Sequence, residues 1–149
     1  MRVRIIREPH PLGFSKYGVQ CGRVTLVLHA WGPGSSDVDI HDHRFSFWSL
    51  VLRGAMTERT WKAVPGSTHQ VLSWQGPGRL ADTGTRCGIR QADCVTRGAG
   101  SLYRRRAPEL HAITVERAPL LTLLVKAYPR QAIPAATVIR PAAADEAKA

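Results

Sequence analysis

The sequence predicts an all-β fold, either a sandwich or a barrel of short strands. Short runs rich in β-branched, aliphatic and aromatic residues recur at roughly even spacing, and breaks containing Gly and Pro separate them. No stretch shows a convincing helical period, and no repeat of solenoid length is visible. Many short strands with turns between them are typical of β-sandwiches and β-barrels.

The length and composition are those of one domain. With 149 residues, of which 44% are hydrophobic, a single core can bury about two-thirds of the surface of the unfolded chain. We therefore expect one domain over residues 1–149, with its core at about 17–128. The residues 141–149 are small and polar. They are expected to fray, with a short helix as the alternative.

The first strands are indicated by alternation and by apolar runs. Residues 1–6 alternate in part, and residues 17–21 and 23–31 form an expected pair whose second member is long and apolar. Two glycines and a proline then interrupt the pattern at 32–37. The next stretch, 41–54, ends in glycine and is expected to form one strand or two strand halves.

The second half of the chain continues in the same way. Residues 55–61 alternate, and residues 68–74 form another expected strand. The segment 79–98 has the weakest pattern of the chain, so we expect a loop or lid there with one short strand near Ile89. Further strands are expected over 101–104, 110–116 and 120–128.

The stretch 41–54 carries the chemistry. His41 and His43 are two residues apart, so in a strand their imidazoles point to the same side, followed on that face by Phe47 if the alternation continues. Two neutral imidazoles on one rigid face are half of a metal site. The alternative is a pair of histidines satisfied by hydrogen bonds in a loop, and a third ligand has to come from elsewhere in the chain.

The charge does not favour a nucleic-acid partner. The formal net charge is +10, but the cationic residues are scattered, and the only cluster is 104–106. That cluster has neither the interleaved aromatic residues of a base-stacking surface nor a helix-turn-helix pattern around it. We expect instead a small anionic substrate, which fits the same charge.

The cysteines and the N-terminus bear on the compartment. Cys21, Cys87 and Cys94 form no CxxC pair, and an odd number is a poor basis for a disulfide framework, so a reducing, cytoplasmic compartment fits best. The apolar part of residues 1–7 is too short for a signal peptide, and no run approaches a membrane span. We therefore expect no membrane partner.

Two motifs resemble those of the cupin superfamily. In the first, G-x5-H-x-H-x3,4-E-x6-G, the residues His41, His43 and Gly54 keep the spacing, and Gly34 precedes His41 by one residue more than usual. The second, G-x5-P-x-G-x2-H-x3-N, is matched at Gly100 and His111. The resemblance covers 34–115 and implies a double-stranded β-helix, or jelly-roll, with a metal site. It also implies a homodimer, since cupins often pair through exposed sheet edges.

The departure from the first motif concerns the metal ligands. Metal-binding cupins typically use three histidines and one glutamate, but here Phe47 stands at the glutamate position. The resemblance then leaves His41, His43 and His111, a ligand set similar to that of the thiol dioxygenases. The cysteine near the second histidine, which those enzymes link to a tyrosine, is missing, so cysteine dioxygenase itself is not expected.

The loss of the carboxylate has a physical consequence. Three neutral imidazoles leave a divalent ion with its full charge and with open positions, a combination that suits an anionic substrate. We therefore expect a metal-dependent enzyme, with a non-haem Fe(II) oxygenase of a small organic anion as the first hypothesis. Imidazole also suits Zn, Mn, Ni or Cu. Two alternatives remain: a non-redox metal enzyme (isomerase, cyclase, lyase or decarboxylase), and a cupin that binds a ligand without turnover.

Three further residues are candidates for catalysis. Glu58 lies on the next expected strand and is a candidate fourth ligand or general base. Tyr103, on the strand before His111, is a candidate source of a phenolic proton. Arg53 has an odd number like His41 and His43, so strand alternation is expected to place it on their face, where it is a candidate clamp for a carboxylate. The structural alternatives are a solvated strand-edge glutamate, a half-buried strand tyrosine and a surface arginine.

Overall fold

The computed structural model describes residues 3–9, 14–37, 39–76, 79–127 and 135–142, and this part of the chain contains nine strands and no helix. The strands are β1 (Val3–Pro9), β2 (Phe14–Cys21), β3 (Val24–Trp31), β4 (Ile40–His41), β5 (Phe47–Gly76), β6 (Arg79–Gly98), β7 (Leu102–Arg105), β8 (Leu110–Ala127) and β9 (Thr137–Pro141). The predicted all-β fold is therefore confirmed. Within the described residues, no helix is present that has the length and hydropathy to cross a bilayer.

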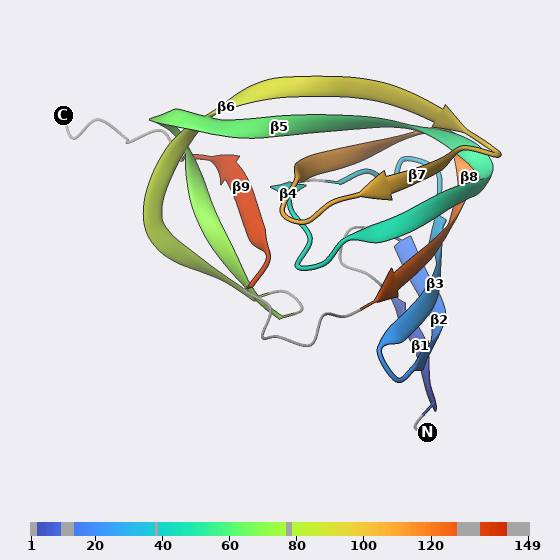
Figure 1. Cartoon of the computed structure of the whole chain (residues 1–149). Coiled ribbons are helices and arrows are strands. Elements are labelled where there is room, and N and C mark those ends of the chain that lie inside the picture. The colour runs from blue at the N-terminus through green and yellow to red at the C-terminus, as the bar shows by residue number, and fades with distance from the viewer. Residues whose placement is uncertain (1–2, 10–13, 38, 77–78, 128–134, 143–149) are drawn as a thin grey trace.

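The strands form one sheet that closes on itself (Figure 1). The order is β1-β2-β3-β8-β4-β9-β5-β6, β7 pairs with β5, and β8 pairs with β5 as well as with β3 and β4. The chain of pairings β5–β8–β4–β9–β5 is a closed ring, so the sheet curls into a barrel. In Figure 1, β5 and β6 run side by side over the top and down the left side of this barrel.

Two long strands replace several predicted short ones. The expected strands 55–61 and 68–74 are parts of the 30-residue β5, and the expected strands 110–116 and 120–128 fall largely in β8. The stretch 41–54 is divided: β4 ends at His41, and β5 begins at Phe47 after a turn. The expected breaks between these strands are bends or register shifts within continuous strands, which a barrel needs in order to close.

The prediction of a loop or lid at 79–98 is wrong. This segment is β6, a 20-residue strand paired antiparallel with β5. Most of its side chains are exposed, so it lacks the buried alternation that would have revealed it. Its conformation is fixed by the pairing, which continues through several shifts of register.

The ends of the domain differ from the expected core of about 17–128. β9 lies beyond it, pairs with β4 and β5, and ends at Pro141, the first residue of the expected fraying tail. The remainder of that tail, 143–149, lies outside the described residues.

An apolar cluster fills the barrel on one side of the histidines. Phe14 stacks on Trp31 with ring centroids 4.0 Å apart. Both rings belong to a buried cluster with residues from β5, β7 and β8, namely Val51, Met56, Tyr103 and Leu120. These side chains anchor the start of β5 against β8.

A register shift near Gly54 corrects the predicted position of Arg53. Phe47 and Val51 point into the barrel, but the pairing with β8 shifts after Val51, and farther along the strand Met56 and Glu58 point inward. The inward positions therefore change from odd to even numbers, and Arg53 is exposed. The parity argument that placed Arg53 with the histidines is wrong, because strand alternation does not survive a bulge.

The close approach at Gly54 yields a stability prediction. Gly54 has φ +83°, and a Cβ there would lie 2.6 Å from the carbonyl oxygen of Pro119 and closer still to that of Arg117. We expect Gly54→Ala to lower the free energy of unfolding by about 2–4 kcal/mol through backbone strain and overpacking. Gly100→Ala is the control, because Gly100 has φ +89° but nothing within 4 Å. Gly100→Ala should lower the free energy of unfolding by only about 1 kcal/mol. Urea unfolding measures both, and equal losses would contradict the steric explanation.

Candidate metal centre

The structure brings the three predicted histidines together inside the barrel. His41 is the last residue of β4, His43 follows in the turn before β5, and His111 is the second residue of β8. His41 is the direct antiparallel partner of His111, so two distant parts of the sequence are held side by side by backbone pairing. One ring nitrogen from each histidine lies within 4.8 Å of the other two.

The segment around His41 and His43 is fixed by its neighbours rather than by a long strand. Between the two histidines, Asp42 is buried: its backbone N–H donates to the carbonyl oxygen of Thr137 (3.0 Å), and its carboxylate accepts from the Thr137 N–H (2.7 Å). Arg140 makes two short bonds to the carboxylate of Asp39. Both anchors are on β9, which the sequence did not predict.

The hydrogen bonds leave lone pairs directed at the centre. The Nδ1 of His111 lies 2.9 Å from a carboxylate oxygen of Glu58, and the Nδ1 of His41 lies 3.2 Å from the carbonyl oxygen of Asp39. Both partners are acceptors, so each Nδ1 carries the proton and each Nε2 is free to coordinate. The Nε2 atoms of His43 and His111 are 2.8 Å apart, a distance at which they share one proton in a hydrogen bond.

Burial keeps the two inner rings neutral. It lowers the pKa of His43 well below its usual value, and the neighbouring imidazoles lower it further. Burial also lowers the pKa of His111, although the hydrogen bond to Glu58 opposes this shift. Neutral imidazole is the form that binds a metal. The donor set therefore fits a divalent ion.

Glu58 lies behind His111 rather than beside the other histidines. Its side chain is buried, with one oxygen bonded to His111 and the other paired with Arg97 at 3.2 Å and with Arg105. Burial alone would raise the pKa of Glu58. The hydrogen bond from His111 and the charge of Arg105 outweigh it and lower the pKa to about 2. A carboxylate so fully engaged is a weak base, and its oxygen is directed at the nitrogen of His111 that faces away from the centre.

Two aromatic residues are buried in this part of the barrel: Phe47 lies against a histidine and Tyr103 lies under Arg97. Phe47, at the position of the missing glutamate, packs edge-on against His43 with centroids 4.8 Å apart. Tyr103 is buried, the guanidinium of Arg97 lies 4.2 Å over its ring, and burial raises its pKa to about 12. The Tyr103 phenol therefore stays protonated at any ordinary pH.

Asp37 is a site residue that sequence analysis missed. Its carboxylate accepts a 2.8 Å hydrogen bond from the backbone of Ile113, two residues after His111, while its other oxygen, Oδ1, is buried without a partner. Burial raises the pKa of Asp37, and electrostatic interaction with His41 and His111 acts in the opposite direction. In the sequence Asp37 stands in a Gly/Ser-rich break, where aspartate ordinarily signals only a turn.

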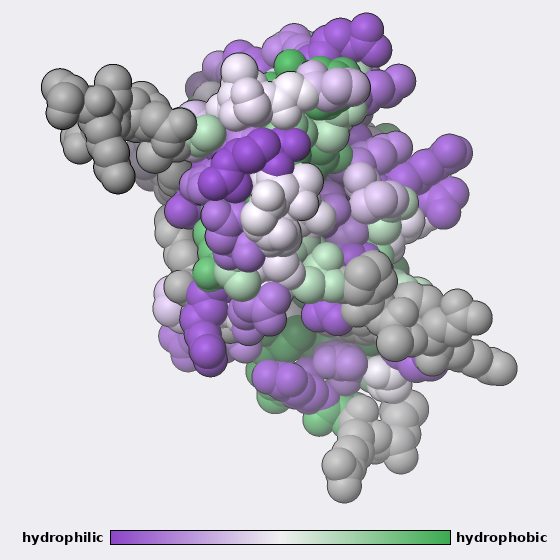
Figure 2. Space-filling view, turned by 90° about the vertical axis from the view of Figure 1, so that its left-hand side faces the viewer, coloured by the Kyte–Doolittle hydropathy of each residue, from purple (hydrophilic) through white to green (hydrophobic). Residues whose placement is uncertain are grey.

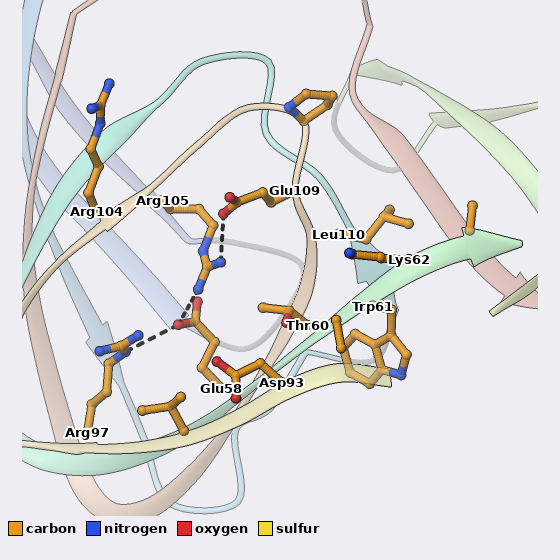
Figure 3. Close-up of a pocket in the computed structure, with 14 residues that line it drawn as sticks. Glu58, Thr60, Trp61, Lys62, Asp93, Arg97, Arg104, Arg105, Glu109 and Leu110 are labelled. Atoms are coloured by element: carbon orange, nitrogen blue, oxygen red, sulfur yellow. Dashed lines mark hydrogen bonds and ion pairs between the residues drawn. The ribbon is translucent and has the colours of Figure 1, made fainter. Parts of the chain in front are cut away.

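A cavity of about 720 Å³ opens on the Glu58 side of the centre (Figure 3). Glu58, Arg97 and Arg105 line it together with Arg104, and Arg105 also pairs with Glu109 at 2.8 Å. The three histidines are not among the residues that line the cavity. Glu58, which the close-up shows between Arg97 and Arg105, therefore stands between the cavity and His111.

Comparisons with known proteins establish the fold. No family model and no curated protein sequence matches the chain. Bacillus subtilis oxalate decarboxylase matches with a TM-score of 0.52 and 14% identity, over 89% of this chain and 29% of that one. Another structure of that enzyme, from work on its Mn(II) centres, gives 0.51 and 15% over 88% and 30%. Hydroxypropylphosphonic acid epoxidase from S. wedmorenis gives 0.51 and 10% over 84% and 56%.

The chain therefore has the cupin fold, as the two motifs indicated. It spans about a third of the length of the oxalate decarboxylases and about half that of the epoxidase. Within this class it is a β-barrel with a three-histidine cluster of the kind that holds a divalent ion.

The geometry of the cluster yields a metal-binding prediction. We expect His43→Ala to lower the affinity of the untagged protein for Fe(II), Mn(II) or Zn(II) by at least about 100-fold, because one of three ligands is lost. Titration calorimetry under anaerobic conditions measures this. His69→Ala should bind metal like the wild type, since His69 is outside the cluster. Unchanged affinity in His43→Ala would contradict the assignment.

Proposed function

We propose that the protein is a metal-dependent enzyme, and specifically a non-haem Fe(II) oxygenase that acts on a small organic anion. The observation that carries this proposal is a set of three converging imidazoles with a phenylalanine where a fourth, anionic ligand would stand. Neutral ligands leave the charge of a divalent ion uncompensated, which favours an anionic substrate. A bound Fe(II) would supply redox chemistry with O₂ and sites for the substrate and O₂ together.

The cavity beside Glu58 supports the anionic substrate class. Arg104 and Lys62 line it and are exposed, and Arg97 is partly exposed. We propose that these cations attract the substrate and that the buried Arg105 holds Glu58 in place. We also propose that a substrate approaches the centre from this cavity, because Thr60 and Leu110, which line it, are the strand neighbours of His111.

Glu58 acts in this proposal as a positioning residue rather than as a fourth ligand or a base. It accepts the Nδ1 proton of His111, which fixes both the ring orientation and the tautomer that presents Nε2 to the metal. Its low pKa keeps it ionised at neutral pH. Tyr103 remains a proposed donor of a hydrogen bond to a substrate, whereas no contact in the structure supports a role for Arg53.

This role of Glu58 predicts a loss of metal affinity without a loss of ligands. We expect Glu58→Gln to lower Fe(II) affinity by about 10–100-fold, since outer carboxylates contribute this much to metal sites. Glu109→Gln is the matched control, because it removes another carboxylate from Arg105 without contact to a histidine. It should bind Fe(II) within about threefold of the wild type. A similar loss in both variants would show that Glu58 acts through Arg105 only.

A non-redox reaction such as decarboxylation is the second candidate. It is favoured by the likeness to oxalate decarboxylase, which shares the fold, and the same three ligands suit Mn(II) or Zn(II). A cupin that binds its ligand without turnover is the third. Each of the three would use the same cavity and the same cations.

Oxygen dependence separates the first two candidates. We expect the untagged protein, loaded anaerobically with Fe(II) and supplied with a panel of small carboxylates and phosphonates, to consume O₂ in the presence of one of them. His43→Ala should abolish this uptake and His69→Ala should retain it. Turnover of the same substrate at an equal rate without O₂, or with Zn(II) in place of Fe(II), would favour the non-redox reaction.

We also propose a cytoplasmic location. None of the three cysteines forms a disulfide, although Cys21 and Cys94 are exposed, and exposed thiols persist in a reducing compartment.

A further inference from the structure

The outer face of one half of the sheet is apolar, and none of the described strands packs against it. Strand pairing places Ile5, Val19, Leu26, Val125 and Trp48 in one row that crosses β1, β2, β3, β8 and β5 at right angles to the strands. All five side chains are between 43% and 79% exposed. Isolated exposed apolar residues are ordinary on protein surfaces, but a continuous row across five strands is not.

The rows on either side continue this surface, which we call the apolar face. The same registers add Val3 and Val24 on one side of the row, and Tyr17, Leu28, Leu123, Leu50 and Leu102 on the other. The strongly exposed members of the apolar face together present on the order of 800 Å² of surface. That exceeds the largest apolar patch of a typical monomer and equals the area that each partner buries in a standard interface.

Few charged side chains lie on the apolar face. Although the net charge is +10, the only charged side chains that these registers place on the apolar face are Arg7 on β1 and Arg104 on β7, at its two ends. Figure 2, which views the molecule from the left-hand side of Figure 1, shows a different face that is mainly hydrophilic. The cationic side chains that an acidic partner or a nucleic acid would bind lie on other surfaces of the protein.

We propose that a second copy of this chain covers the apolar face. Two copies with the same high positive charge meet with least repulsion where both lack charge, and the area available matches what a stable dimer needs. Two twisted sheets pack face to face about 10 Å apart with their strands nearly aligned. The dimer is isologous, with its two-fold axis near Leu26 and Val125 in the middle of the row.

A charge placed on the apolar face tests this proposal. Leu26 lies in the middle of the row and is 45% exposed. Ala81 on β6 is the control, because it is exposed and β6 pairs with a part of β5 that is away from the apolar face. We expect the full chain to be a dimer by sedimentation equilibrium at micromolar concentration, Ala81→Glu to remain dimeric, and Leu26→Glu to dissociate at least about 100-fold more readily. A wild-type monomer at all concentrations, or a Leu26→Glu dimer as tight as the wild type, would overturn the proposal.

The cysteines supply a second measurement that needs no variant. Cys21 is exposed and pairs in register with Val3 and Val24 at the border of the apolar face, whereas Cys94 is exposed on β6. As the protein is concentrated, alkylation of Cys21 should slow several-fold while that of Cys94 stays constant. Equal rates at every concentration would overturn the proposal. So would protection of Cys21 by neutral phosphatidylcholine vesicles but not by concentrated protein, because the face would then bind lipid.

Discussion

The structure depends on the pairing of β8 with a different strand on each of its edges. At His111, β8 pairs with His41 of β4 on one side and with Thr60 of β5 on the other. This arrangement closes the barrel and places the third histidine between the strand that leads to the first two and the strand that carries Glu58. The register is well determined, because a one-residue slip of β8 would turn His111 outward and put Leu110 or Ala112, neither of which can bind a metal, in its place.

The second constraint is the buried carboxylate of Glu58. An ionised carboxylate inside a protein is costly unless it is paired and hydrogen-bonded, and here both oxygens are used, by His111 on one side and by two guanidinium groups on the other. Buried ion pairs contribute little net stability compared with apolar side chains of similar volume. The retention of such a network beside a histidine cluster is therefore better explained by the orientation of His111 than by stability.

The sequence was sufficient for the fold class and for the histidines, because both depend on local patterns. Alternation indicated the strands, and the spacing of His41 and His43 indicated one side of a site. It was insufficient where long-range pairing decides the structure. The segment 79–98 became a strand only through its pairing with β5, and the bulge near Gly54 reversed the parity on which Arg53 depended.

Other site residues had no local signal at all. The burial of Asp42 and the partnerless oxygen of Asp37 depend on β8 and β9, which are about 75 or more residues away in the sequence. Glu58 was found as a candidate by its position on a neighbouring strand, but its role could not be assigned. Whether a carboxylate binds a metal or the far nitrogen of a histidine depends on a few ångströms, which spacing along a strand does not determine.

Phe47 stands where the cupin motif has a ligand glutamate, so the three histidines bring no negative charge to the centre, even though a carboxylate lies close by. Glu58 contacts His111 from behind, but its charge is matched by Arg97 and Arg105, so it does little to compensate a cation held by the three rings. A divalent ion held there would therefore remain positively charged, and the buried ring of Phe47 against His43 would make the surroundings less polar and strengthen electrostatic interactions. In the function proposed above, an anionic substrate would supply the missing negative charge. It would complete the coordination of the ion in place of a protein carboxylate, so the positive charge of the centre would fall only when the anion binds.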